Sequence, residues 1–242
     1  MLKISEFEVM GWEHAIRGMR NPMNSWEKSD SYILNCYGNC DECVDIDCQN
    51  QPDMNGGFVL ELNDLNLMKR LRNAGTDHRK FMRMITVYLD ITAPLYWWKE
   101  FDTYKVGTVA NSCSTMHKIA AKEFTLEDFS HEHMLDVEGE AIEFNNAPGD
   151  YWNSIAILDV TVRVLNMYRE LYLETKDKKY WWQMIQLLPS SYNQKRTVML
   201  NYEVLANIYK SRKDHKLDEW RTFCDWIEEL PYSEVITGYE ED

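Results

Sequence analysis

Apolar residues recur along this chain with two different periods. Between Ile85 and Ile91 they alternate with polar residues, which predicts a β-strand, and residues 2–10 resemble a second, shorter strand. Most of the remaining apolar residues follow a helical spacing. It predicts helices at about 12–19, around 65–71, from Pro94 through the paired tryptophans, and at about 151–174, 178–187, 194–211 and 216–229. We therefore expect an α+β protein, mostly helical, with a modest sheet.

Residues 28–57 interrupt this pattern, because they are polar, rich in cysteine and end in Asn55-Gly56-Gly57. We expect them to form an insertion or a long loop. The apolar fraction of 45% is enough to bury a sizeable core. A single domain over residues 1–242 that carries this insertion is the predicted organisation, with two small domains as the alternative.

Four cysteines of this segment are spaced C-x3-C-x2-C-x4-C: Cys36, Cys40, Cys43 and Cys48. Four thiolates that approach one another can bind a structural zinc ion, which would stabilise a loop too polar to fold alone. Reduced cysteines in a flexible loop are an equally good interpretation, and the first three also match the spacing of radical-SAM iron–sulfur proteins. Cys113, far from this cluster, is expected to be a small buried thiol rather than a nucleophile.

The formal charge of −14 limits the partners that the protein can have. A general nucleic-acid binder would present a basic face, so this class is disfavoured. Most of the acidic residues are expected on a solvated surface. No apolar run approaches the length of a membrane span, and the N-terminus lacks the apolar core of a signal peptide, so we expect a cytoplasmic protein without a membrane partner.

The segment Asp77–His117 carries a distinctive order of residues. His78 precedes the predicted strand, and Ala93-Pro94 precedes the helix with the paired tryptophans. Small polar residues follow in the stretch from Thr108 to Met116. This order combines one histidine, a strand, a helix and a polar segment within forty-one residues.

A second segment, Leu188–Trp220, opens with Leu188-Pro189 and carries Asn201, Asn207 and Arg212. The two segments together resemble, in their spacing, the signature motifs of the flavin-dependent thymidylate synthases, the thymidylate-synthase-complementing or ThyX-like family. The organisation of the chain between the segments is compatible with this resemblance.

The resemblance implies a small, mostly antiparallel sheet with flanking long helices. It also implies FAD as a candidate cofactor and a homo-oligomer, which in that family is a tetramer. Finally, it implies a set of ligand-binding residues, some at positions of the family's motifs and some replacing motif residues. These are His78, Lys99, Glu100, Tyr104, Lys105, Asn111, Ser114, Asn201, Glu203, Asn207 and Arg212.

Most identities in the family's motifs are nevertheless replaced. In the family, arginines hold the phosphate of dUMP and polarise its ring, whereas the matching positions of this chain are Thr115 and Ile185. Glu203 replaces a further arginine. Removing two charged contacts from a desolvated phosphate site costs several kcal/mol, or roughly three decades in affinity. We therefore expect the protein not to be an ordinary dUMP methylase.

Three functions remain open from the sequence. The first is a non-canonical or non-catalytic binder of a nucleotide-like ligand or flavin. The second is a flavin-dependent enzyme, similar to a pyrimidine nucleotide methyltransferase, that modifies a pyrimidine nucleotide or a related small molecule. The third is an acidic protein–protein interaction protein, such as an inhibitor or a nucleic-acid mimic. The lost arginines favour the first over the second, and whether the protein is an enzyme stays open.

Overall fold

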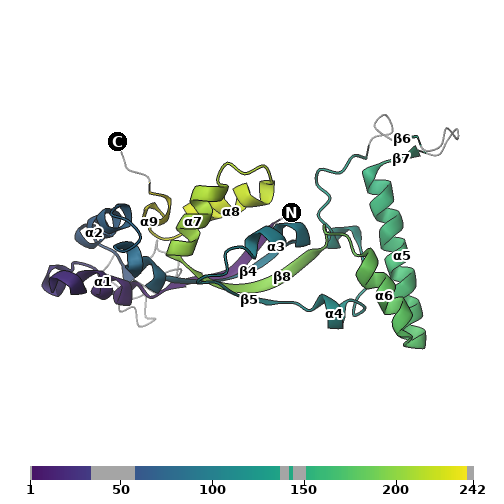
Figure 1. Cartoon of the computed structure of the whole chain (residues 1–242), viewed down its shortest axis with the longest axis horizontal. Helices are drawn as coiled ribbons and strands as arrows, with labels where there is room; N and C mark the ends of the chain where they lie inside the picture. The colour runs from purple at the N-terminus through teal and green to yellow at the C-terminus, as the bar shows by residue number, and fades with distance from the viewer. Residues whose placement is uncertain (1, 34–57, 137–141, 144–150, 239–242) are drawn as a thin grey trace, which may run out of the picture. The chain divides into compact units, whose positions relative to one another are not determined.

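The computed structural model describes residues 2–33, 58–136, 142–143 and 151–238 (Figure 1). The chain forms two compact units and passes between them several times. Unit 1 contains residues 1–3, Thr92–Asp102 and Ser112–Arg196. Unit 2 contains Ile4–Ile91, Thr103–Asn111 and Thr197–Asp242. The organisation as a single domain stays a prediction.

The helices and strands alternate irregularly along the chain. The strands are β1 (Lys3–Met10), β2 (Tyr32–Ile33), β3 (Phe58–Val59), β4 (Thr86–Pro94), β5 (Val109–Ser112), β6 (Ile142–Glu143), β7 (Tyr151–Trp152) and β8 (Asn193–Asn201). The α-helices are α1 (Trp12–Arg20), α2 (Leu62–Asn73), α3 (Leu95–Phe101), α4 (Thr115–Lys118), α5 (Ser154–Thr175), α6 (Lys178–Leu187), α7 (Tyr202–Arg212), α8 (Asp218–Glu228) and α9 (Glu234–Thr237). Short 3-10 helices include η2 (Trp26–Lys28) and η6 (Arg79–Met84).

Four strands form a small antiparallel sheet in the order β1-β4-β8-β5. The pairs β2–β3 and β6–β7 form separate two-stranded ladders. The α+β class with a small, mostly antiparallel sheet and flanking long helices is therefore confirmed.

One predicted helix is wrong in its first half. Residues 194–211 were expected to be helical, but Asn193–Asn201 is strand β8 and only α7 is helical. Within β8, Gln194, Val198 and Leu200 are buried while residues between them are more exposed, which is the period of two that a half-buried strand requires. Asn201 then starts the helix, because its side chain accepts a hydrogen bond from the Val204 amide at 3.1 Å.

The core of unit 2 gathers around Tyr202, the first residue of α7. Its side chain is fully buried, its hydroxyl donates to the Pro231 carbonyl at 2.6 Å, and its amide donates to the Ile85 carbonyl at 3.1 Å. The ring of Trp12 meets Tyr202 and Tyr232 edge-on, at centroid distances of 5.3 and 5.2 Å. Tyr202 thereby joins α1, the residue before β4 and the segment that leads to α9.

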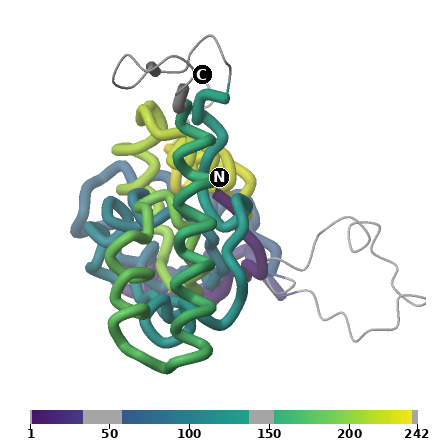
Figure 2. Tube along the Cα trace, turned by 90° about the vertical axis from the view of Figure 1, so that its right-hand side faces the viewer, coloured from purple at the N-terminus to yellow at the C-terminus, as the bar shows by residue number. Residues whose placement is uncertain are grey.

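The core of unit 1 lies along the hairpin of α5 and α6, which run side by side (Figures 1 and 2). Its buried members are Ile119, Ala120, Phe124, Phe129, Leu158, Val162, Leu165 and Met184. The same unit contains α3, where the Trp98 indole donates to the Gln194 carbonyl at 2.9 Å. The guanidinium of Arg196 stacks on Trp98 at 4.1 Å from the ring centroid and binds Asp102 at 2.7 Å.

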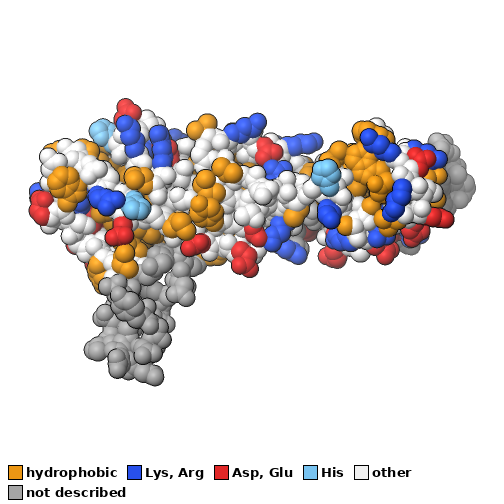
Figure 3. Space-filling view, turned by 90° about the horizontal axis from the view of Figure 1, so that it is seen from below, with side chains coloured by type: hydrophobic (Ala, Val, Ile, Leu, Met, Phe, Trp, Pro, Cys, Tyr) orange, Lys and Arg blue, Asp and Glu red, His pale blue; other side chains and the backbone are white. Residues whose placement is uncertain are grey.

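The face shown in Figure 3 carries charges of both signs, together with contiguous apolar patches. This agrees with the expectation that much of the acidic excess is solvated. None of the helices in the described part of the chain combines the length and the apolar composition needed to cross a bilayer.

A buried carboxylate, Asp64 on α2, organises the start of the predicted insertion. The ladder of β2 and β3 pairs Tyr32 with Val59 and Ile33 with Phe58. Asp64 forms an ion pair with the buried Arg20 at 2.6 Å and accepts hydrogen bonds from the hydroxyls of Ser29 and Ser31 at 2.7 and 2.8 Å. Burial alone would raise the pKa of Asp64, but the bonds from Ser29, Ser31 and Arg20 outweigh it and hold this pKa below its ordinary value.

We expect Asp64→Asn to destabilise the protein by about 3–5 kcal/mol, because it leaves the buried Arg20 without its counter-charge. For a chain of this length the loss corresponds to a Tm lower by about 10 °C. The exposed carboxylate Asp214 offers a matched control, and Asp214→Asn should shift the Tm by no more than about 2 °C. Equal shifts for the two variants would contradict the assignment.

The same pair predicts a pH dependence. A carboxyl group whose pKa is lowered by folding stabilises the protein above its unfolded-state pKa of about 3.9. That stability is lost as the pH falls through the lower, folded-state pKa. The difference in unfolding free energy between the wild type and Asp64→Asn, measured by urea unfolding, should therefore be constant at neutral pH and shrink below about pH 4.

Candidate ligand-binding residues

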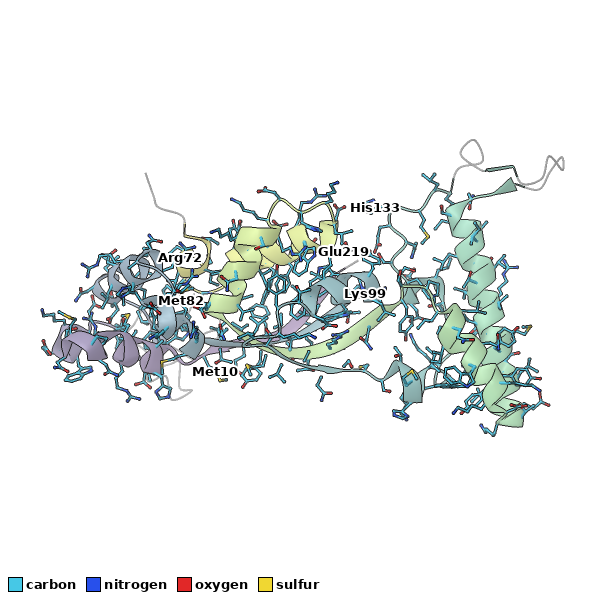
Figure 4. All side chains as sticks on the ribbon, viewed as in Figure 1. Met10, Arg72, Met82, Lys99, His133 and Glu219 are labelled. Atoms are coloured by element: carbon cyan, nitrogen blue, oxygen red, sulfur yellow. The ribbon has the colours of Figure 1, made fainter. Side chains whose placement is uncertain are left out.

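The predicted ligand-binding residues divide between the two units. Lys99, Glu100 and Ser114 lie in unit 1, and the other eight lie in unit 2. Lys99 is exposed on α3, where the neighbouring tryptophans are buried (Figure 4). The role of the eleven predicted residues in binding stays a prediction. The structure shows which of these residues contact one another and which have a role in the fold.

Arg212 and Tyr104, two of the predicted residues, contact each other within unit 2. The Nε of Arg212 donates to the Tyr104 hydroxyl at 2.9 Å, and its Nη1 lies 3.0 Å from Nε2 of His215. The guanidinium also stacks on Trp220 at 4.7 Å from the ring centroid. Arg212 is therefore a half-buried cation in a fixed orientation, the form in which arginine recognises a planar anion.

Glu203 is held by two arginines of η6 that the sequence analysis did not connect with it. Its carboxylate forms an ion pair with Arg83, in which Nη2 lies 3.2 Å from Oε1, and with Nε of Arg79 at 3.6 Å. The hydrogen bond and charge of Glu203 raise the pKa of Arg83. The negative charge of Glu203 alone would repel a phosphate, but the two arginines largely neutralise this charge. The sequence signal was the spacing of Arg79 and Arg83, which are four residues apart.

Two predicted polar residues act as helix caps. Asn201 caps α7, and the Ser114 hydroxyl caps α4 by accepting from the His117 amide at 3.0 Å. Gly107 packs closely on Asn201, since a Cβ at this position, where φ is 80°, would lie 2.9 Å from Nδ2 of Asn201. These contacts give both residues a structural role that does not require a ligand.

The four remaining predicted residues of unit 2 are exposed at the surface: His78, Lys105, Asn111 and Asn207. Such side chains are accessible to a ligand. These residues fit a flavin less well than the arginine-histidine-arginine run that the resemblance would place at Thr103–Lys105. Thr103 and Tyr104 supply no cationic donor, and the Tyr104 hydroxyl already accepts a hydrogen bond from Arg212.

The two positions where the resemblance would place phosphate-binding arginines, Thr115 and Ile185, lie in unit 1. Ile185 packs against the buried cluster of α5 and α6. Thr115 is the first residue of α4 and is partly buried. Neither side chain offers a charge to a phosphate.

The cysteine cluster of Cys36, Cys40, Cys43 and Cys48 lies outside the described residues, so the zinc site stays a prediction. Within residues 2–33, 58–136 and 151–238, no three His, Cys, Asp or Glu side chains come together in a way that could hold a metal ion. The prediction for Cys113 is wrong, because this thiol is exposed at the end of β5. Cys224 is the buried thiol, and burial raises its pKa to about 12, which keeps it protonated and unreactive.

No protein-family model matches the sequence, and no curated protein matches it. Solved structures do match the fold. Thymidylate synthase X (ThyX) from Helicobacter pylori, solved with FAD and dUMP, aligns over 98% of this chain and 97% of its own, with a TM-score of 0.62 and 14% identity. A UMP/dUMP methylase, PolB from Streptomyces cacaoi, solved with 5-Br dUMP, covers 99% of this chain and 95% of its own, with a TM-score of 0.53 and 11% identity. The chain therefore has a divergent ThyX-like fold.

The ion pairs of Glu203 allow a direct test. Glu203→Arg, which places an arginine at this motif position, would set a third guanidinium beside Arg79 and Arg83. Because these groups are partly exposed, we expect a loss of roughly 1–2 kcal/mol, seen as a Tm lower by about 2–8 °C. Combining it with Arg83→Glu should recover part of the loss, since the swapped pair attracts again. Additive losses in the double variant would contradict the pairing.

Proposed function

We propose that this protein is a ThyX-like binder of a nucleotide-like ligand or flavin that does not methylate dUMP in the ordinary way. The fold supports the first part, because both the ThyX and the PolB structures that share it were solved with a pyrimidine nucleotide bound. The claim that the protein does not methylate dUMP in the ordinary way rests on a single observation. It concerns the contacts made by the residues at the positions where the resemblance would place phosphate-binding arginines.

Each of those positions now serves the fold instead of a phosphate. Ile185 is part of an apolar cluster, Thr115 begins a short helix, and Glu203 is engaged with Arg79 and Arg83. A dianionic phosphate needs several charge-assisted donors in fixed positions. Arg212 remains as a fixed cation, so a ligand with a smaller or more delocalised negative charge suits the unit better than dUMP.

The protein is expected not to produce dTMP from dUMP, and a thymidine-auxotrophic strain that carries this gene alone should not grow without thymidine. The physical reason is the loss of transition-state binding by several kcal/mol, which corresponds to three or more decades in rate at about 1.4 kcal/mol per decade. Growth without thymidine would refute the proposal.

Restoring the arginines provides the converse experiment. Thr115→Arg with Ile185→Arg should strengthen dUMP binding by at least about tenfold in calorimetry, because each new charge contributes roughly 1.5–3 kcal/mol to a phosphate contact. Thr115→Met with Ile185→Met is the control, since it adds long side chains at both positions without a charge. Equal dUMP affinities in all three proteins would show that these residues do not lie at a phosphate site.

We also propose that the protein self-associates. Helix α5 exposes an apolar stripe at helical spacing, with Ile157, Val160 and Met167 exposed by 50%, 39% and 46%. Apolar side chains aligned in this way on one helix favour burial against another copy. The stripe supports a homo-oligomer, and its stoichiometry, a tetramer by analogy with the resembled family, stays a prediction.

Light scattering at micromolar concentration should therefore give a multiple of the chain mass of 28.8 kDa. Met167→Glu should lower the mass, because it places a charge within the apolar stripe. Arg221→Gln changes an exposed arginine of α8, away from the stripe, and should leave the mass unchanged. A mass near that of one chain for the wild type would contradict self-association.

A further inference from the structure

Unit 1 contains a pocket that none of the predicted ligand-binding residues lines. It has a volume of about 410 Å³ and lies where α4 meets the end of α5 and the start of α6. The residues that give it its chemistry are Met116, His117, Tyr172, Lys176, Lys178 and Trp181. Its volume falls within the range of sites that hold small molecules.

The pocket has a rigid apolar floor. Ile119 and Ala120 line it and are exposed by only 5% and 9%, because they belong to the core of the unit. Tyr172 and Trp181 pack against the same core. The indole Nε1 of Trp181 donates to the Met116 carbonyl at 3.1 Å, which fixes the plane of the ring. The pocket therefore offers a preformed aromatic wall above buried apolar side chains.

The rim of the pocket is cationic, although the chain as a whole carries a charge of −14. The ammonium of Lys176 lies 6.0 Å from the ring centre of Tyr172, and that of Lys178 lies 5.8 Å from that of Trp181. The part of Figure 3 at the right shows Lys and Arg side chains beside apolar ones, with some Asp and Glu side chains among them. Among the lining residues that the structure describes there is no carboxylate.

The one carboxylate between the two lysines is already engaged. Asp177 accepts a hydrogen bond from the Lys179 amide at 2.9 Å, which caps α6, and its other oxygen lies 3.0 Å from the Lys179 ammonium. In the part of the chain that the structure describes, Lys176 and Lys178 make no ion pair of their own. Their charges are therefore directed to the pocket and to solvent.

Lys176 occupies a backbone position that normally favours glycine. It ends α5 with φ of 57°, and its amide donates to the Tyr172 carbonyl at 2.9 Å. A side chain in this left-handed conformation costs about 1 kcal/mol relative to glycine. A cationic side chain at the C-terminal end of a helix also interacts favourably with the helix dipole.

We propose that this pocket binds a small planar aromatic anion of mononucleotide size. The ring lies against the wall of Trp181 and Tyr172, and the anionic group is held by Lys176, Lys178 and His117. This inference names a further place for a nucleotide-like ligand and is tested apart from the proposed function, because none of the predicted ligand-binding residues lines the pocket. A failure of adenosine monophosphate to bind here would leave the outcome of the dUMP experiments unchanged.

Three probes separate the contributions of ring and charge. Adenosine 5′-monophosphate carries both, adenosine carries the ring alone, and inorganic phosphate carries the charge alone. Calorimetry with the full chain at low salt should show that the monophosphate binds at least about tenfold more tightly than either of the others. Its affinity should fall as salt is added, because exposed lysines are screened.

The Lys178–Lys179 doublet supplies a matched control, since only Lys178 lines the pocket. Lys178→Gln and Trp181→Leu should each weaken binding of the monophosphate by about five- to tenfold. Lys179→Gln, at the adjacent position, should weaken it by less than about twofold. All three side chains are exposed or partly exposed, and circular dichroism checks that each variant is folded.

The results decide the proposal directly. Selective weakening by Lys178→Gln and Trp181→Leu supports it. Undetectable binding of the monophosphate at millimolar concentration overturns it, and so does a monophosphate affinity equal to that of phosphate. Equal effects of the pocket variants and of Lys179→Gln also overturn it, because they would indicate a diffuse basic surface instead of a site.

Discussion

The burial of Tyr202 is the constraint on which the described part of unit 2 depends. Its hydroxyl and amide bind Pro231 and Ile85, and its ring receives Trp12, so the start of α7 is fixed by three separate parts of the chain. An unpaired tyrosine hydroxyl would be costly in such a site, and burial raises the pKa of Tyr202 well above its ordinary value. Because the helix begins at this residue, the neighbouring Glu203 is carried to Arg79 and Arg83, and Arg212 at the other end meets Tyr104. The fold thus sets the positions of the charged groups before any ligand is involved.

The chain has a ThyX-like fold at 14% identity to ThyX. A charged residue that faces a ligand contributes little to folding, so it can change without loss of the fold. At two positions where the resemblance would place arginines, this chain has residues with contacts of their own: Ile185 packs against an apolar cluster, and Glu203 forms ion pairs with Arg79 and Arg83. Reverting Glu203 alone to arginine would therefore break ion pairs within the fold.

The sequence could predict most of the elements, because their periodicity is local. The alternation at Ile85–Ile91 and the helical stripes of α5, α6 and α8 were each confirmed. Strand β8 was missed, since Gln194 is a buried polar residue within it and the helical pattern of α7 follows without a glycine or proline between them. The Arg212–Tyr104 contact could be predicted only from the resemblance, because 108 residues separate the two. The pocket of unit 1 could not be predicted at all, as Met116 and Trp181 meet only through the packing of three helices.

Cations packed on aromatic rings recur in both units, but their surroundings give them different roles. Arg196 stacks on Trp98 with its charge balanced by Asp102, and Arg212 stacks on Trp220 with Tyr104 as a hydrogen-bond partner. A guanidinium used in this way is partly desolvated and donates to acceptors of the protein, so it contributes to the fold. Lys178 beside Trp181 keeps an ammonium that is exposed and compact. Such a group retains its capacity to bind an incoming anion. The charge of Arg196 on Trp98 is balanced by Asp102, whereas Lys178 on Trp181 has no carboxylate partner among the described residues. This difference separates the structural contact on Trp98 from the pocket at α4–α6.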